Sequence, residues 1–332
     1  MRDYAVKILV IGGTSFIGKH IVTEAKTNGH EITLFNRGLT DPSSIVGMET
    51  ITGDRDTDLY LLDKKEWDAV IDTCGYDPIS VDKTVSYLNG RVSLYVFVSS
   101  VAVYERPPTN TTIEVTEESP IYRAFSNKDL NSFEQFSYNK AMCEQVVLNT
   151  FKESALIVRP SMVTGEGDPT NRLAYWLYKF LNNEDIIIPG PNNWRIEYID
   201  VKDLSSWLIK TIEENITGIF NLSGPSPSMT AKQFFNSIIN YTKFQKQVFW
   251  IDENFLIDNG TFTFYSFPLW IPRNLGVFNI NYRKAITNGY KNTSIINTLQ
   301  DLTFNQRADL NIGINTAKEQ QLIKLWQGVT TN

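Results

Sequence analysis

Hydrophobic positions in the first half of the chain follow two alternating patterns. Short runs rich in β-branched residues predict buried strands, and longer amphipathic stretches predict helices. The predicted helices span residues 16–28, where Gly29 ends the pattern, and 136–151. The predicted strands span residues 6–11, 31–35, 49–52, 67–73, 93–99 and 155–158. Strands that alternate with helices in this way predict an α/β fold with a doubly wound parallel sheet.

The pattern loosens after residue 160. Proline and glycine cluster at residues 165–169, 189–191 and 224–227, and further strands are predicted at 197–201 and 218–221. We expect residues 1–165 to form the first domain, with 196–222 returning to it. Residues 166–195 and 223–332 are expected to form a smaller C-terminal lobe beside the carboxyl ends of the strands. Ligands of doubly wound sheets bind in the crevice outside the carboxyl ends of the strands. The lobe beside it is therefore predicted to bind a small-molecule substrate.

A glycine-rich turn directly follows the first predicted strand and opens the first helix. Gly12 allows a tight turn, Gly18 lets the helix pack closely on the sheet, and the amides at the helix N-terminus attract a pyrophosphate. Ser15 replaces the middle glycine of the usual pattern, which adds a Cβ but also a hydroxyl donor. The context of strand, turn and helix favours a dinucleotide site over a purely structural turn. The predicted contacts here are Gly12, Thr14, Ser15, Phe16, Ile17 and Gly18.

The ends of the second and third strands bear on the choice of dinucleotide. An NAD site usually presents a carboxylate after the second strand, whereas here Asn36 and Arg37 stand there. Arg37 can pair with a 2′-phosphate, which favours NADP, with NAD as the alternative; a solvent-exposed turn residue is the simpler interpretation. Asp54 and Arg55 follow the third strand. An aspartate there can accept from the adenine amino group or cap the next helix, and the sequence favours neither.

Composition narrows the class of protein. The chain has 332 residues, a net charge of −6 and a pI of about 5.2, with no basic stripe, which argues against a nucleic-acid partner. Two scattered cysteines and two histidines form no metal-binding pattern, so no metal is expected. The apolar run at residues 5–11 is too short to span a bilayer. We expect a cytoplasmic protein with no membrane partner.

Seven segments occur in the order typical of one enzyme family. They are GGTSFIG (12–18), GDRD (53–56), VFVSSVAVY (96–104), NKAMCE (139–144), VRPSMVTG (158–165), IEYIDVKDL (196–204) and GIFNLSGP (218–225). Together they resemble the extended short-chain dehydrogenase/reductase superfamily, specifically the NAD-dependent epimerase/dehydratase family. The resemblance implies a Rossmann fold with a substrate lobe and an oxidoreductase acting on a sugar nucleotide or another small polar carbonyl or alcohol. It also allows a homodimer built from two long helices.

The resemblance also implies a Ser/Tyr/Lys site. Ser100 takes the position of the serine that holds the substrate oxygen. Lys140 takes that of the lysine that holds the nicotinamide ribose and lowers the pKa of a catalytic tyrosine. The remaining implied cofactor contacts are Cys74, Gly75, Ser99, Pro160 and Met162.

The family tyrosine is replaced by Phe136, one helical turn before Lys140. Tyr138 lies two residues from Lys140, and at about 100° per residue it faces nearly the opposite way. Three interpretations stay open. In the first, the protein is a dinucleotide-binding sensor or scaffold with little or no catalysis. In the second, it uses another acid or base, such as Tyr76, Tyr104 or a carboxylate of the second lobe. In the third, the helix register differs from the one assumed. The spacing of Lys140 and Glu144 argues against the last. RNA binding, known from a related plastid branch, is a remote alternative that the acidic pI disfavours.

Overall fold

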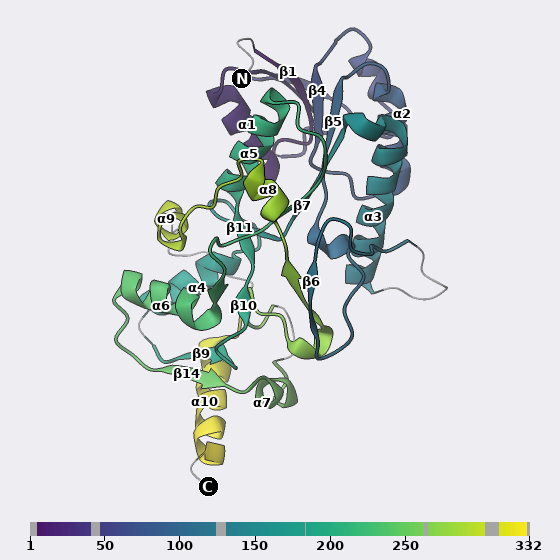
Figure 1. Ribbon diagram of the computed structural model, residues 1–332. Helices are drawn as coiled ribbons and strands as arrows, with labels where there is room; N and C mark the ends of the chain where they lie inside the picture. The colour runs from purple at the N-terminus through teal and green to yellow at the C-terminus, as the bar shows by residue number, and fades with distance from the viewer. Residues whose placement is uncertain are drawn as a thin grey trace.

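A seven-stranded parallel sheet forms the centre of the computed structural model, which describes residues 5–40, 47–123, 131–182, 184–261, 265–302 and 312–330 (Figure 1). The strand order is β12-β7-β5-β4-β1-β2-β3. The strands are β1 (Lys7–Ile11), β2 (Glu31–Asn36), β3 (Glu49–Thr52), β4 (Ala69–Asp72), β5 (Leu94–Val98), β7 (Ala155–Pro160) and β12 (Gly218–Leu222). The predicted Rossmann-type, doubly wound α/β fold is therefore confirmed.

Helices cover both faces of the sheet, which explains why its central strands are almost continuously apolar. Helices α1 (Phe16–Thr27) and α5 (Val201–Glu213) pack together on one face, and α2 (Pro78–Leu88) and α3 (Ser132–Phe151) pack together on the other (Figure 1). Side chains of β1 alternate between the two layers. Ile8 and Val10 join the core beneath α1 and α5, whereas Leu9 and Ile11 join the core beneath α2 and α3.

The order of the strands reverses between β1 and β4. From β1 the chain builds β2 and β3 on one side, then crosses to add β4, β5, β7 and β12 on the other. Loops that leave the carboxyl ends of β1 and β4 therefore run in opposite directions and open a crevice between them. The glycine-rich turn at residues 12–18 lies at this reversal point.

A second apolar core, rich in aromatic residues, lies below the sheet in Figure 1. Its largest members include Trp176, whose indole Nε1 donates to the Pro268 carbonyl at 2.6 Å. The elements around it are α4 (Arg172–Leu181), β9 (Ile186–Pro189), β10 (Arg195–Ile196), β13 (Met229–Thr230), α6 (Ala231–Thr242), β14 (Val248–Ile251), α7 (Glu253–Asp258), α9 (Ile295–Asp301) and α10 (Thr316–Thr330).

Shorter elements connect the two cores. Two parallel pairs join β6 (Thr112–Val115) to β15 (Val277–Ile280) and β8 (Met162–Thr164) to β11 (Tyr198–Asp200). The described loops also contain the 3-10 helices η2 (Leu59–Leu62), η3 (Val101–Val103), η4 (Lys152–Ser154) and η5 (Arg273–Leu275). Helix α8 (Arg283–Thr287) packs on β12, and Ala285 and Tyr290 join the core beneath α1 and α5. The sequence did not predict this late return to the sheet. Within the described ranges, no helix is long and apolar enough to cross a membrane.

Glu197 ties the segment between β10 and β11 to β15. Its carboxylate accepts a hydrogen bond from the Ile280 amide at 2.8 Å. Burial raises the pKa of Glu197 from 4.5 to about 7, although the Ile280 amide and Arg195 oppose that shift. The unfolded chain therefore releases this proton at a lower pH than the folded protein does. Stability is expected to fall as the pH rises from about 4.5 to 7.

We expect Glu197→Gln to stabilise the protein at pH 8 by on the order of 1–3 kcal/mol and to change stability little at pH 4.5. Glutamine keeps an oxygen acceptor for the Ile280 amide but cannot ionise. Urea unfolding at both pH values measures the difference, with Glu31→Gln on the exposed start of β2 as the control. An equal gain at both pH values would contradict the assignment of Glu197.

Candidate active site

The glycine-rich turn requires glycine at particular points. Gly12 and Gly13 adopt φ angles of +98° and +84°, in the left-handed region that favours glycine. A Cβ on Gly12 would lie 2.5 Å from the Thr73 hydroxyl oxygen, and one on Gly18 would lie 2.8 Å from the Gly13 Cα. The close contact at Gly18 is therefore with the turn itself, not with the sheet as expected from the sequence. The turn is a narrow cradle that side chains would fill.

This turn borders a cleft of about 560 Å³ at the carboxyl ends of β1 to β4. Most of the predicted cofactor contacts line it: Gly12, Thr14, Ser15, Phe16, Ile17, Gly18, Asn36, Arg37, Asp54, Arg55 and Cys74. Sequence reasoning missed several other residues of the lining, including Leu39, Thr40, Asp77, Ser80 and Pro169. Pro169 had a signal, because it ends a Gly- and Pro-rich cluster, but its place on this cleft depends on how the chain returns from β8.

The ends of β2 and β3 present polar groups to the cleft. The Asn36 amide donates to the Gly12 carbonyl at 3.3 Å and accepts from the Gly38 amide at 2.9 Å, so its side chain braces the turn. Arg37 is exposed at the cleft edge. The Asp54 carboxylate accepts from the Asp56 amide at 2.9 Å and so closes a turn within the loop, whereas the next helix, η2, begins at Leu59 with Asp58 at its N-cap. Its contact with adenine stays a prediction.

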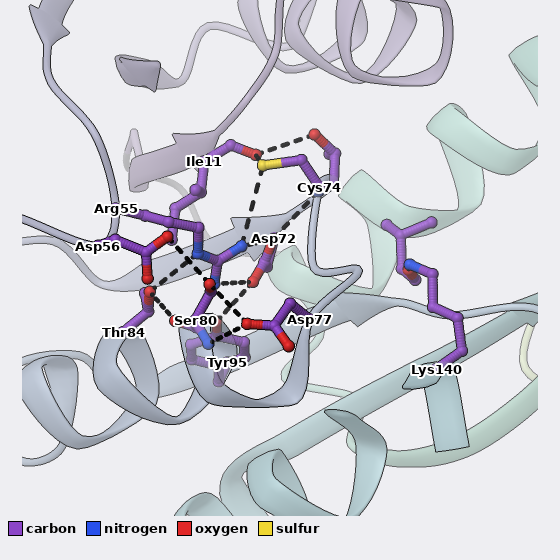
Figure 2. A network of polar contacts seen from close by, with 12 residues as sticks. Ile11, Arg55, Asp56, Asp72, Cys74, Asp77, Ser80, Thr84, Tyr95 and Lys140 are labelled. Carbon is purple, nitrogen blue, oxygen red and sulfur yellow. Dashed lines mark hydrogen bonds and ion pairs between the residues drawn. The ribbon is translucent and has the colours of Figure 1, made fainter. Parts of the chain in front are cut away.

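Arg55, on the cleft lining, forms a buried ion pair with Asp72 (Figure 2). The Arg55 guanidinium donates to both oxygens of Asp72, at 2.8 and 3.2 Å, and to the Thr84 hydroxyl at 3.1 Å. The Tyr95 hydroxyl donates to Asp72 at 2.9 Å. Burial opposes both charges, but their attraction prevails: the pKa of Asp72 lies below its ordinary value and that of Arg55 above. Arg55 therefore ties the loop after β3 to β4 and α2.

Cys74 and Gly75 shape the loop after β4. The Cys74 thiol lies 3.6 Å from the Ile11 carbonyl oxygen, and burial raises its pKa to about 11. A thiol that stays protonated at neutral pH is a poor nucleophile. A Cβ on Gly75 would lie 2.4 Å from the Phe97 ring, so glycine lets this loop lie against β5.

Lys140 lies between two aromatic rings on the buried face of α3. Its ammonium donates to the Val98 carbonyl at 2.9 Å and lies 4.4 Å from the ring centroid of Tyr76 and 4.9 Å from that of Phe97. Burial lowers the pKa of Lys140, although Asp72 opposes the shift. Phe136, one turn earlier, places its ring 6.4 Å from that of Tyr76. Phe136 and Lys140 thus share a helix face, and the register is the one that the sequence predicts.

Ser100 and Ser99 have different surroundings despite being neighbours. The Ser100 hydroxyl accepts from the Ala102 amide at 3.1 Å, and the residue stays partly exposed at the start of η3. The Ser99 hydroxyl is turned inward and donates to the buried Glu144 carboxylate. Pro160 is buried in β7, and Met162 packs against the aromatic core of the second lobe. Gly75, Ser99, Lys140, Pro160 and Met162 lie off the cleft lining, and their contacts with a cofactor stay predictions.

Tyr104 is fully engaged in a buried network. Its hydroxyl donates to the Asn221 side chain at 2.6 Å and accepts from Arg159 at 2.9 Å. Arg159 in turn pairs with Glu144 at 2.6 Å. Only 1% of the Tyr104 surface is exposed, so its hydroxyl cannot reach a substrate without breaking this network.

A family model described as the NAD dependent epimerase/dehydratase family matches residues 8–81 and 83–223. The chain belongs to the NAD-dependent epimerase/dehydratase family. The match covers the strands of the main sheet and both the serine-bearing and the lysine-bearing segments. No curated protein sequence matches the chain.

Solved structures of the family share the fold at low sequence identity. The dTDP-glucose 4,6-dehydratase of Bacillus anthracis str. Ames, in complex with NAD, has 15% identity and a TM-score of 0.65, covering 89% of this chain and 96% of that one. The UDP-glucuronic acid 4-epimerase of Bacillus cereus, with NAD, has 15% identity and a TM-score of 0.63, covering 89% and 94%. The UDP-glucose 4-epimerase of Thermus thermophilus, with NAD, has 16% identity and a TM-score of 0.63, covering 89% and 97%.

Gly18→Ala tests the cradle. The added methyl group would meet the backbone of Gly13 at 2.8–2.9 Å, which has no flexible side chain to move aside. We expect the turn to shift and the affinity for a nicotinamide dinucleotide to fall at least about tenfold, with a stability loss of about 1–3 kcal/mol. Titration calorimetry and thermal unfolding measure the two effects. Gly328→Ala, whose methyl group meets no atom within 4 Å, is the control; an equal effect of both substitutions would refute the steric argument.

Proposed function

We propose that this protein is an NAD(P)-dependent oxidoreductase that acts on a sugar nucleotide or another small polar carbonyl or alcohol. The observation that carries the proposal is the cleft at the carboxyl ends of β1 to β4, where the glycine cradle meets Asn36, Arg37 and Asp54. Membership of the epimerase/dehydratase family supports it. The sugar-nucleotide class is suggested by the names of the similar structures, which share only the fold with this chain.

Separate residues of the chain would bind the dinucleotide and take part in the chemistry. Backbone amides at the start of α1 would hold the pyrophosphate, because the helix dipole and the unpaired N–H groups of a helix N-terminus attract anions. Lys140 would hold the nicotinamide ribose, and Ser100 would hold and orient the substrate oxygen. When bound, the dinucleotide supplies or accepts the hydride. The partly exposed Ser100 hydroxyl is open to such a contact, whereas Ser99 is not.

NADP is the cofactor that the residues favour. No carboxylate stands at the end of β2, and the exposed Arg37 lies on the cleft lining. A guanidinium pairs with a phosphate dianion through charge-assisted hydrogen bonds. The same cation offers nothing comparable to the ribose hydroxyl of NAD.

Arg37→Ala is expected to weaken NADPH binding about 10–100-fold, the loss of one charge-assisted pair, and to leave NADH binding within about threefold. Thermal-shift titration with the two dinucleotides measures the change, because a ligand that binds the native state raises the melting temperature by mass action. Arg283→Ala on the exposed side of α8 is the matched control. A loss of equal size for both dinucleotides would show that Arg37 does not read the 2′-phosphate.

Ser100→Ala tests the chemistry. We expect the substrate-dependent absorbance change at the reduced-nicotinamide band to fall about 10²–10³-fold, because the substrate oxygen loses a positioned hydrogen-bond donor. Dinucleotide affinity should stay within about twofold, since Ser100 does not line the dinucleotide cleft. Unchanged turnover in the variant would remove Ser100 from the mechanism.

A second candidate function is dinucleotide binding without catalysis. Phe136 favours it, because a phenyl ring on the face of Lys140 can neither donate nor accept a proton. Tight binding of a dinucleotide, with no turnover across a broad panel of carbonyls and sugar nucleotides, would support this candidate over the oxidoreductase.

A further inference from the structure

The site beside Lys140 lacks the tyrosine hydroxyl that the family places on α3. Among the tyrosines that the sequence offers as substitutes, Tyr104 is buried with its hydroxyl bound by Arg159 and Asn221. Tyr138 lies two residues from Lys140 on a regular helix, so it faces away from Lys140. Tyr76, from the loop between β4 and α2, is the candidate that the fold brings to Lys140.

Three observations place the Tyr76 ring on the cleft lining, close to Lys140 and Phe136. The residue lines the dinucleotide cleft, and 56% of its surface is exposed. Its ring centroid lies 4.4 Å from the Lys140 ammonium. Its ring also lies 6.4 Å from that of Phe136, which occupies the family tyrosine position. The Tyr76 ring therefore lies next to both the Lys140 ammonium and the ring at the family tyrosine position.

We propose that Tyr76 is the proton donor and acceptor of this enzyme and replaces the helix tyrosine from a loop. The inference rests on the proposed oxidoreductase function and deepens it. In the direction of reduction, Tyr76 would give its proton to the carbonyl oxygen, while a bound reduced nicotinamide would supply the hydride to the carbonyl carbon. The phenolate then takes a proton from water, which reaches the half-exposed ring. Oxidation of the alcohol follows the same path in reverse.

The surrounding groups favour the protonated form of the Tyr76 phenol, which is the form that donates a proton. Burial raises the pKa of Tyr76, with smaller contributions from Cys74 and Asp72, so the phenol is neutral and able to donate a proton at neutral pH. The Lys140 ammonium lies over the Tyr76 ring, 4.4 Å from its centroid, on the helix face that also carries Phe136. Asp72, the buried carboxylate of this region, is paired with Arg55, which moderates its repulsion of the phenolate (Figure 2).

Tyr76→Phe is the decisive variant, because it removes the hydroxyl and keeps the ring over Lys140. NADPH and NADH affinities are measured by fluorescence titration. Turnover is measured at the reduced-nicotinamide band with UDP- and dTDP-sugars and small aldehydes and ketones. We expect dinucleotide affinity within about twofold of the wild type and kcat lower by about 10²–10⁴-fold, the usual contribution of a general acid or base. Tyr60→Phe, on an exposed tyrosine in η2 outside the cleft, is the matched control and should match the wild type.

A second variant separates a chemical role of the hydroxyl from a structural one. Tyr76→Phe combined with Phe136→Tyr moves the hydroxyl onto α3, one turn from Lys140. We expect this double variant to recover at least about tenfold of the lost kcat. The pH dependence of kcat/KM should lose an ionisation in Tyr76→Phe and regain one in the double variant. A merely structural role would give no such recovery.

The outcomes distinguish the two proposals. Wild-type turnover with a Tyr76→Phe variant within about threefold of it would overturn the role of Tyr76 and leave the oxidoreductase standing. Dinucleotide binding by the wild type without turnover on any substrate of the panel would overturn the oxidoreductase, and the role of Tyr76 with it. Loss of turnover with intact dinucleotide affinity, reversed in the double variant, is the result that supports both.

Discussion

The buried ion pair between Glu144 and Arg159 is the interaction on which the site depends. The two side chains meet at 2.6 Å with 0% and 2% of their surfaces exposed. Glu144 belongs to α3 and Arg159 to β7, so the pair fixes the rotation of the helix against the sheet. Ser99 donates to Glu144, and Arg159 donates to the Tyr104 hydroxyl and to the Glu117 carbonyl. A buried charge that loses its partner costs about 3–5 kcal/mol, so this arrangement has little freedom to shift.

The positions of Lys140 and Tyr104 depend on the pair of Glu144 and Arg159. Lys140 lies one turn before Glu144 and is held between two rings, while Tyr104 is withdrawn into the network. A second buried pair, Arg55 with Asp72, holds the loop after β3 against β4 in the same way. The proposed dinucleotide binding would therefore depend on backbone geometry at the glycine cradle, whereas the proposed proton transfer would depend on side chains of α3 and of the loop between β4 and α2. A family member could therefore keep the glycine cradle and still rearrange the side chains proposed to transfer protons.

Features that rest on local rules could be predicted from the amino-acid sequence. Strand and helix periodicity located the six strands of the main sheet that precede residue 161 and the seventh at residues 218–221. The left-handed φ angles at Gly12 and Gly13 are a local requirement of the backbone that favours glycine. The turn can therefore be recognised in the sequence by its glycines. The placement of Phe136 on the same face as Lys140 could be predicted as well, because residues four apart on a helix share a face.

Tertiary structure alone decided which side chains meet. From its place after β3, Arg55 was predicted to contact the cofactor. In the fold, its guanidinium is paired with Asp72. Tyr76 and Tyr104 were equal candidates in the sequence, and packing placed one over Lys140 and the other against Arg159. The return of α8 to the sheet had no local signal either. Contacts between distant segments depend on the distances and burial that the whole fold creates, and no periodicity along the chain encodes them.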